Sequence, residues 1–162
     1  MYRSARCAAV LVLFLAIVGS SVFAPRAHAA GVTDLGVLPG GADSTAHAIN
    51  DAGQIAGAAA VAGDTYSGFF WENGVMTEIV RPGWRYSGPI AMNAAGVITG
   101  AIQNATGFTY VNFTWSAGVL TDLPALPGGF EATANAINAA GMVVGDSAAG
   151  VQFERHAAVW TP

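Results

Sequence analysis

The chain contains one cysteine, Cys7, and no lysine among its 162 residues. A single cysteine excludes a disulfide framework within the chain and a metal site built from several thiolates. The six basic residues, all arginine, stand against ten acidic residues, and the formal net charge is −4. This balance argues against a nucleic-acid partner, because phosphate binding needs a basic face. The longest apolar run, residues 8–18, is too short for a membrane-spanning helix, which needs about 20 residues.

The N-terminus has the three parts of an export signal. Arg3 and Arg6 precede the apolar run, and a small-x-small sequence at residues 27–29 follows it. This order predicts a secretory signal peptide over residues 1–29, cleaved after Ala29. The exported domain, residues 30–162, then keeps three arginines against ten acidic residues, for a net charge of −7, and loses Cys7. We therefore expect a secreted protein, extracellular or periplasmic, with no membrane attachment after cleavage.

The rest of the chain repeats one pattern three times. An Ala-x-Asn-x-Ala-Gly motif recurs with its asparagines 43 and 45 residues apart. A proline lies eleven residues before each asparagine, and a tryptophan lies 21 or 22 residues after it. The anchors are Asn50, Asn93 and Asn138, with Trp71, Trp115 and Trp160. Their shared spacing predicts three structural repeats, at about residues 36–79, 80–123 and 124–162.

Each repeat shows signals for short β-strands. Asn-x-Ala-Gly is typical of a tight turn, and a β-forming segment follows it each time. Phe69 and Trp71 lie two residues apart and therefore share one face of a strand. Gly, Pro and Ala-Gly pairs interrupt every window long enough for a stable helix. We expect about four short antiparallel strands per repeat, and residues 31–35 match the strand that the third repeat lacks.

These signals predict an all-β fold in one domain. Four strands in about 40–45 residues is the period of a β-propeller blade, so we expect propeller-like blades in a partial propeller or arc. A three-fold β-trefoil or β-prism remains the alternative. Residues 31–35 would complete the last repeat as its fourth strand and close the array.

Three segments carry a family resemblance. They are residues 34–41 (Asp-Leu-Gly-Val-Leu-Pro-Gly-Gly), residues 48–57 (Ala-Ile-Asn-Asp-Ala-Gly-Gln-Ile-Ala-Gly) and residues 156–160 (His-Ala-Ala-Val-Trp). Together they resemble the bacterial extracellular repeat family named after its His-Ala-Phe tripeptide, the HAF repeats, over essentially all of residues 32–162. The resemblance implies secreted, repetitive β structure of propeller-like form and implies no particular reaction.

The repeated residues are best interpreted as structural anchors. The aromatic residues of the repeats are expected in the core, where they bury large apolar areas. The repeated asparagines are expected to cap turns. A calcium site at Asn50 and Asp51 is the alternative, but the other two repeats have Ala94 and Ala139 in place of the carboxylate.

No catalytic constellation stands out. Asp43, Ser44 and His47 lie close in sequence, but a hydrolytic triad needs converging groups and an oxyanion hole, and the chain has no Gly-x-Ser-x-Gly elbow. His156 has no partner at zinc-ligand spacing. We expect no enzyme activity, no metal and no cofactor; a hydrolase is the weakest alternative.

One segment differs from its counterparts in the other repeats. Arg81, Trp84, Arg85 and Tyr86 occupy positions where the other repeats have no arginine, tryptophan or tyrosine. These residue types are enriched at binding hot spots. The segment is a candidate binding loop for an acidic or sugar ligand or a second subunit; packing of Trp84 onto its own sheet is the alternative.

The functional hypothesis is a secreted, non-catalytic β-repeat protein that binds an unidentified extracellular ligand or associates with itself. A carbohydrate-binding domain of three-fold β type is the alternative, and three equivalent pockets would distinguish it.

Overall fold

The computed structural model describes residues 31–63, 65–107, 109–150 and 154–162. The chain divides into two units, residues 1–32 and 33–162. The predicted export signal, residues 1–29, and its cleavage site after Ala29 lie outside the described residues. No helix in the described part of the chain is long and apolar enough to cross a membrane.

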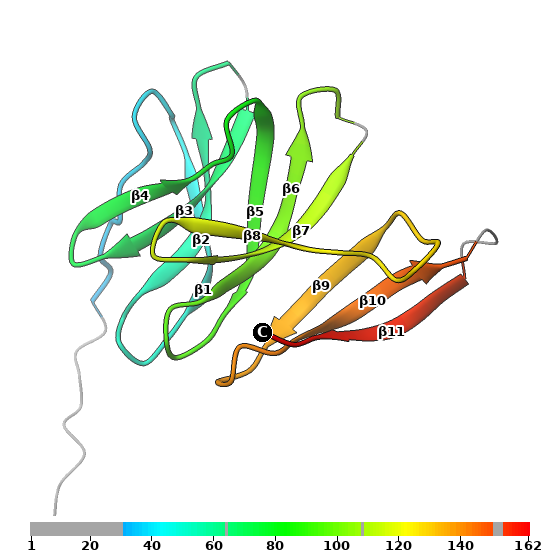
Figure 1. Cartoon of the computed structure of the whole chain (residues 1–162). Coiled ribbons are helices and arrows are strands. Elements are labelled where there is room, and N and C mark those ends of the chain that lie inside the picture. The colour runs from blue at the N-terminus through cyan, green and yellow to red at the C-terminus, as the bar shows by residue number, and fades with distance from the viewer. Residues whose placement is uncertain (1–30, 64, 108, 151–153) are drawn as a thin grey trace, which may run out of the picture. The chain divides into compact units, whose positions relative to one another are not determined.

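The second unit consists of three antiparallel sheets that follow one another along the chain (Figure 1). The first sheet has the order β1-β2-β3-β4, the second β5-β6-β7-β8, and the third β11-β10-β9. The strands are β1 (Ser44–Ile49), β2 (Ile55–Val61), β3 (Thr65–Glu72), β4 (Val75–Ile79), β5 (Trp84–Met92), β6 (Ile98–Asn104), β7 (Tyr110–Ser116), β8 (Val119–Leu123), β9 (Ala132–Ile137), β10 (Val143–Ala149) and β11 (Glu154–Trp160). The all-β prediction is confirmed, and the described residues form no helix and no closed barrel.

The third sheet has three strands, where the sequence led us to expect a fourth from residues 31–35. Those residues belong to no strand. The Asp34 side chain accepts a hydrogen bond from the Gly36 backbone at 2.9 Å, and Gly36 has a φ of 85°. This hydrogen bond closes a local turn at residues 34–36. In this structure residues 31–35 therefore do not form the fourth strand that the sequence predicts for the last repeat.

The three repeated asparagines build the turn between the first two strands of each sheet. In each turn the asparagine Oδ1 accepts backbone hydrogen bonds from the residues two and four positions later, all at 3.0–3.1 Å. The turn glycine has a φ of 77–81° in all three, a left-handed conformation that glycine adopts without steric cost. Turn chemistry that is local in sequence thus fixes the same strand pairing three times.

Each sheet also has a bulge opposite a glycine in its second strand. The register shifts by one residue in β1, β5 and β9, and the unpaired residues are His47, Ile90 and Asn135. A Cβ on the glycine would come within about 2 Å of a carbonyl oxygen of the first strand, as the distance of 2.2 Å at Gly100 illustrates. Only glycine permits this close approach, which explains its recurrence at Gly57, Gly100 and Gly145.

The main core lies between the first two sheets. Ile79 from β4 packs with Ile98 and Phe113 from the second sheet, and all three are fully buried. The Phe70 ring of β3 contacts the Trp115 ring of β7, with their centroids 5.2 Å apart. A smaller cluster of Leu38, Ala59 and Phe69 lies on the first sheet. Each core thus includes the aromatic residue that the repeat pattern places two positions before its tryptophan.

Candidate functional site

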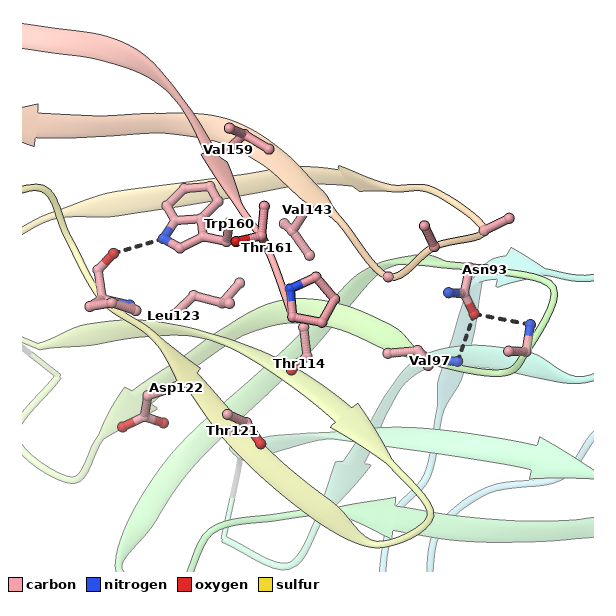
Figure 2. Close-up of a pocket in the computed structure, with 16 residues that line it drawn as sticks. Asn93, Val97, Thr114, Thr121, Asp122, Leu123, Val143, Val159, Trp160 and Thr161 are labelled. Atoms are coloured by element: carbon pink, nitrogen blue, oxygen red, sulfur yellow. Dashed lines mark hydrogen bonds between the residues drawn. The ribbon is translucent and has the colours of Figure 1, made fainter.

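A cavity of about 700 Å³ lies where the second and third sheets meet. We call it the junction cavity. Figure 2 shows Trp160 and Val143 of the third sheet on one side, with Thr114 and Leu123 of the second sheet facing them. The Asn93 and Asn138 turns lie at one end of the cavity, and the remaining lining is Ala95, Val97, Thr121, Asp122, Pro124, Ala139, Ala140, Gly141, Val159, Thr161 and Pro162.

The junction cavity has a simple origin in the repeat sequence. Thr114 occupies the position of Phe70 one repeat earlier, and Trp160 occupies the position of Trp115. At the first junction the Phe70 ring lies against Trp115. At the second junction the smaller threonine leaves that space open, and the Trp160 indole donates a hydrogen bond to the Pro124 carbonyl at 2.8 Å. The phenylalanine-to-threonine difference between repeats therefore contributes to the space at this junction, where the third sheet also has one strand fewer than the first.

Few polar side chains line the junction cavity. Thr114 and Thr121 contribute hydroxyl groups, while the Asp122 carboxylate is paired with Arg81 in an exposed salt bridge. The cavity therefore offers an apolar surface with an indole and hydroxyls.

A chain of asparagine side chains connects the three sheets at the end of the cavity. The Asn50 Nδ2 donates to the Asn93 carbonyl at 3.2 Å, and the Asn93 Nδ2 donates to the Asn138 carbonyl at 3.0 Å. Asn50 and Asn93 thus cap their own turns and also bind the next sheet, and Asn138 accepts the second of these hydrogen bonds. We call this arrangement the asparagine ladder. The sequence predicted the turn caps, but nothing in it indicated the connection between sheets.

The candidate binding loop is used mainly for internal contacts. Trp84 begins β5 and packs against the main core, so only the residues before it are loop. The Arg81 guanidinium lies 4.9 Å from the centre of the Trp84 ring and pairs with Asp122 of β8. Arg85 and Tyr86 lie in β5 and are exposed. The space beside these residues has no volume for a water molecule.

The sequence neighbours Asp43, Ser44 and His47 do not converge. The Ser44 hydroxyl donates to the Gly36 carbonyl at 2.7 Å, and the His47 Nδ1 lies 2.8 Å from the Pro89 carbonyl oxygen. Asp43 accepts a hydrogen bond from the exposed Tyr66 hydroxyl at 3.3 Å. That bond and the negative charge of Asp43 raise the pKa of Tyr66 above its ordinary value.

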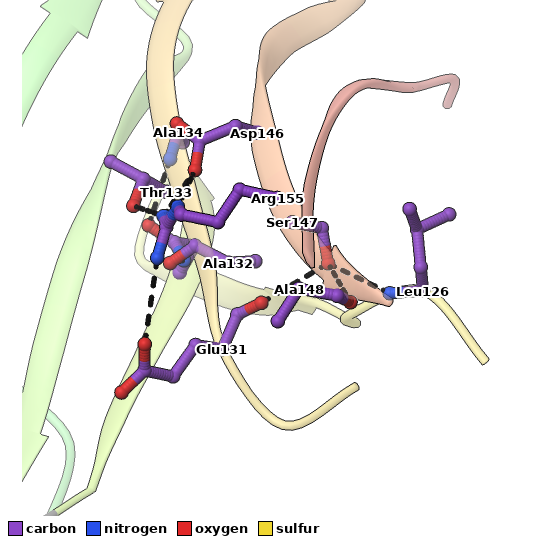
Figure 3. A network of polar contacts seen from close by, with 10 residues as sticks. Leu126, Glu131, Ala132, Thr133, Ala134, Asp146, Ser147, Ala148 and Arg155 are labelled. Carbon is purple, nitrogen blue, oxygen red and sulfur yellow. Dashed lines mark hydrogen bonds and ion pairs between the residues drawn. The ribbon is translucent and has the colours of Figure 1, made fainter. Parts of the chain in front are cut away.

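A polar network holds the three strands of the third sheet together (Figure 3). Arg155 of β11 pairs with Asp146 of β10 and donates to the Thr133 hydroxyl of β9 at 2.7 Å. It also lies 3.5 Å from the Glu131 carboxylate. His156 lies beside it on the exposed strand, 3.8 Å from Glu154. In the described part of the chain, no three His, Cys, Asp or Glu residues come together as a potential metal site.

No family model matches the chain, and no curated protein or solved structure matches it significantly.

Proposed function

We propose that the chain is a secreted, non-catalytic β-repeat protein that binds a small extracellular ligand in the junction cavity. The observation that carries the proposal is the opening of this cavity at one junction of a scaffold whose other junction holds a phenylalanine in the same position. A volume of about 700 Å³ lies within the usual range for small-molecule sites.

The lining indicates the class of ligand. The Trp160 indole provides a broad apolar surface, and the Thr114 and Thr121 hydroxyls can donate and accept hydrogen bonds. A sugar ring matches this chemistry, because it has an apolar face and a rim of hydroxyl groups. We therefore favour a neutral saccharide over an anion, since Arg81, the nearest cation, is already paired with Asp122.

The architecture that we propose is a propeller-like arc with the three sheets as blades. Three consecutive antiparallel meanders of about 44 residues, each packed on the next, support it. A three-fold carbohydrate-binding domain with equivalent pockets is less well supported, because Phe70 lies where the first junction would need its pocket.

The test fills the cavity by substitution. Thr114→Phe recreates the side chain that the first junction has, and Thr77→Phe is the matched control on the exposed outer strand of the first sheet. Both variants and the native chain are titrated by calorimetry with a panel of neutral oligosaccharides.

We expect at least one saccharide to bind the native chain and the Thr77→Phe variant equally, and to bind Thr114→Phe at least tenfold more weakly. Circular dichroism should show unchanged β structure in both variants. If no saccharide binds, or if Thr114→Phe binds as well as the native chain, the proposed site is wrong.

A further inference from the structure

We propose that the chain binds a second copy of itself head to tail. The head face is the side of the first sheet that carries Leu38 and Phe69, and the tail face is the side of the third sheet that carries Val144 and Val159. In this arrangement, residues 31–35 of one copy add to β11 of the other as the missing fourth strand. Three independent features of the structure lead to this contact.

The first feature is the direction of the asparagine ladder. Asn50 donates to the second sheet and Asn93 donates to the third. Asn138 caps its own turn in the same way, but its Nδ2 has no hydrogen-bond partner among the described residues. At the other end, no side chain of the described residues donates to the Asn50 carbonyl oxygen. The ladder therefore ends with a donor on the third sheet and an acceptor on the first, which are complementary.

The second feature is apolar surface at positions that the first junction buries. Val144 and Val159 are cross-strand partners in the third sheet, 48% and 57% exposed. Their counterparts, Ala56 and Phe70, are cross-strand partners in the first sheet and pack into the main core. Figure 2 shows Val159 on the side of β11 away from Trp160, as strand alternation requires. The third sheet thus presents the surface that the first sheet uses to bind the second.

The head face carries the matching exposed position. Ile49 is 69% exposed and pairs with Ile55. Its counterpart Met92 pairs with Ile98 and packs against the main core at the first junction. The third sheet of a second copy, packed against the head face, would bury Ile49 in the same way.

The third feature is the segment before β1, which has the local fold of a linker between sheets. The Gly41 backbone donates to the Leu38 carbonyl at 3.0 Å, and the Gly129 backbone donates to the Leu126 carbonyl at 2.9 Å. Leu126 belongs to the connection between the second and third sheets. Residues 36–43 are therefore folded as the entrance to a following sheet, although no sheet precedes them among the described residues of their own chain.

Residues 31–35 resemble the strand that precedes such a linker. Gly-Val-Thr-Asp-Leu matches the sequence of β8, Val-Leu-Thr-Asp-Leu, at its last three residues. Leu35 lies nine residues before the start of β1, and Leu123 lies nine residues before the start of β9. The edge strand β11 pairs on one side only, with β10. Strand addition by another copy would give its backbone groups their second partner.

The repeat fixes the register of the added strand. Thr114 of β7 pairs with Thr121 of β8, and Phe70 of β3 pairs with Thr77 of β4. The same alignment pairs Val159 of one copy with Thr33 of the other. Two copies joined at both ends bring six sheets together, which lies within the four to eight blades of closed propellers. A closed head-to-tail dimer is therefore the expected assembly.

The register provides a direct test by disulfide cross-linking. The full chain is expressed for export with Cys7→Ser and the pair Thr33→Cys and Val159→Cys. Directly opposite residues on antiparallel strands lie about 4.5–5.5 Å apart between Cα atoms, within the range that a disulfide can bridge. The matched control pairs Thr33→Cys with Ala157→Cys, which is two residues out of register. Products are separated by non-reducing electrophoresis after mild oxidation.

We expect covalent dimers from the in-register pair and far fewer from the control. A disulfide within one chain would overturn the proposal, because residues 31–35 would then complete their own third sheet. Equal yields from the two pairs, or no disulfide, would overturn it as well.

A second measurement does not depend on cysteine chemistry. Light scattering on a sizing column gives the mass of the native chain, of Val159→Lys and of the control Val75→Lys, an equally exposed valine on the outer strand of the first sheet. The native chain and the control should be dimers and Val159→Lys a monomer. A monomeric native chain, or a dimeric Val159→Lys variant, would refute the head-to-tail contact.

Discussion

Replacing Asn93 with alanine tests the asparagine ladder at its middle position. Its Oδ1 accepts hydrogen bonds from the Ala95 and Val97 backbone at 3.0 Å each, and its Nδ2 donates to the Asn138 carbonyl at 3.0 Å. The residue is 6% exposed. Removing one partner of a buried hydrogen bond costs about 1–3 kcal/mol. Asn93→Ala removes three such bonds at once. Because water can reach part of this turn and replace some of them, we expect the free energy of unfolding to fall by about 3–4 kcal/mol, less than the full sum.

The same substitution at Asn138 should have a smaller effect in a chain that is not bound to a second copy. Asn138 is exposed, and its side chain makes two cap hydrogen bonds and no other within the described residues. Water can replace these, so Asn138→Ala should lower the free energy of unfolding by about 1 kcal/mol, as typical of a lost cap. Asn93→Asp separates the two roles, because the carboxylate keeps both cap acceptors and loses the donor. We expect a loss of about 2 kcal/mol for it, mainly from the inter-sheet bond.

All three variants are made in the monomeric Val159→Lys chain, and urea unfolding followed by tryptophan fluorescence measures them against that parent. The ladder argument requires the order Asn93→Ala, Asn93→Asp, Asn138→Ala, from most to least destabilised. Equal losses for the two alanine variants would show that the asparagines act only as turn caps. A neutral Asn93→Asp would show that the bond between sheets contributes nothing.

Three further predictions concern other parts of the fold. Gly100→Ala should lower the free energy of unfolding by about 3 kcal/mol, because its Cβ would lie 2.2 Å from a carbonyl oxygen. Gly74→Ala is strained only by its φ of 85° and should lower the free energy of unfolding by about 1 kcal/mol. Urea unfolding measures both variants. Asp43→Ala removes both the hydrogen-bond acceptor and the charge, so it should lower the pKa of Tyr66 toward its ordinary value, measured by ultraviolet titration of the phenol; an unchanged pKa would exclude Asp43 as the cause. Phe70→Ala should lower the thermal midpoint and reduce the free energy of unfolding by about 2 kcal/mol, because it removes a half-buried ring from the main core. An unchanged thermal midpoint would contradict the packing described for the first junction.

Local chemistry explains what could be predicted from the sequence. An Asn-x-Ala-Gly turn is specified by a few adjacent residues, so its three copies are visible without any knowledge of the fold. The alternation of Phe69 and Trp71 likewise indicates a strand with one buried face. The turns, the all-β class and the extent of each sheet follow from such signals, and each sheet lies within one predicted repeat.

The candidate site depends on contacts between repeats, which local patterns do not specify. The difference between Phe70 and Thr114 was present in the sequence, but only the packing of the sheets shows that this position faces the next tryptophan. Trp84 was interpreted as a candidate hot spot from its type. In the structure its ring packs on its own core, because β5 begins at that residue.

The difference between Phe70 and Thr114 also indicates how a protein of this kind can diversify. At the first junction this position holds Phe70, which contacts the next tryptophan, and at the second it holds Thr114, which lines the cavity. The residue lies on a strand whose pairing is fixed elsewhere by turns and glycines. A single substitution per repeat could therefore reshape a recognition site, while the turns and glycines that fix the strand pairing stay the same. Duplicating a unit would multiply potential sites as well as surface, and each copy could then acquire its own selectivity.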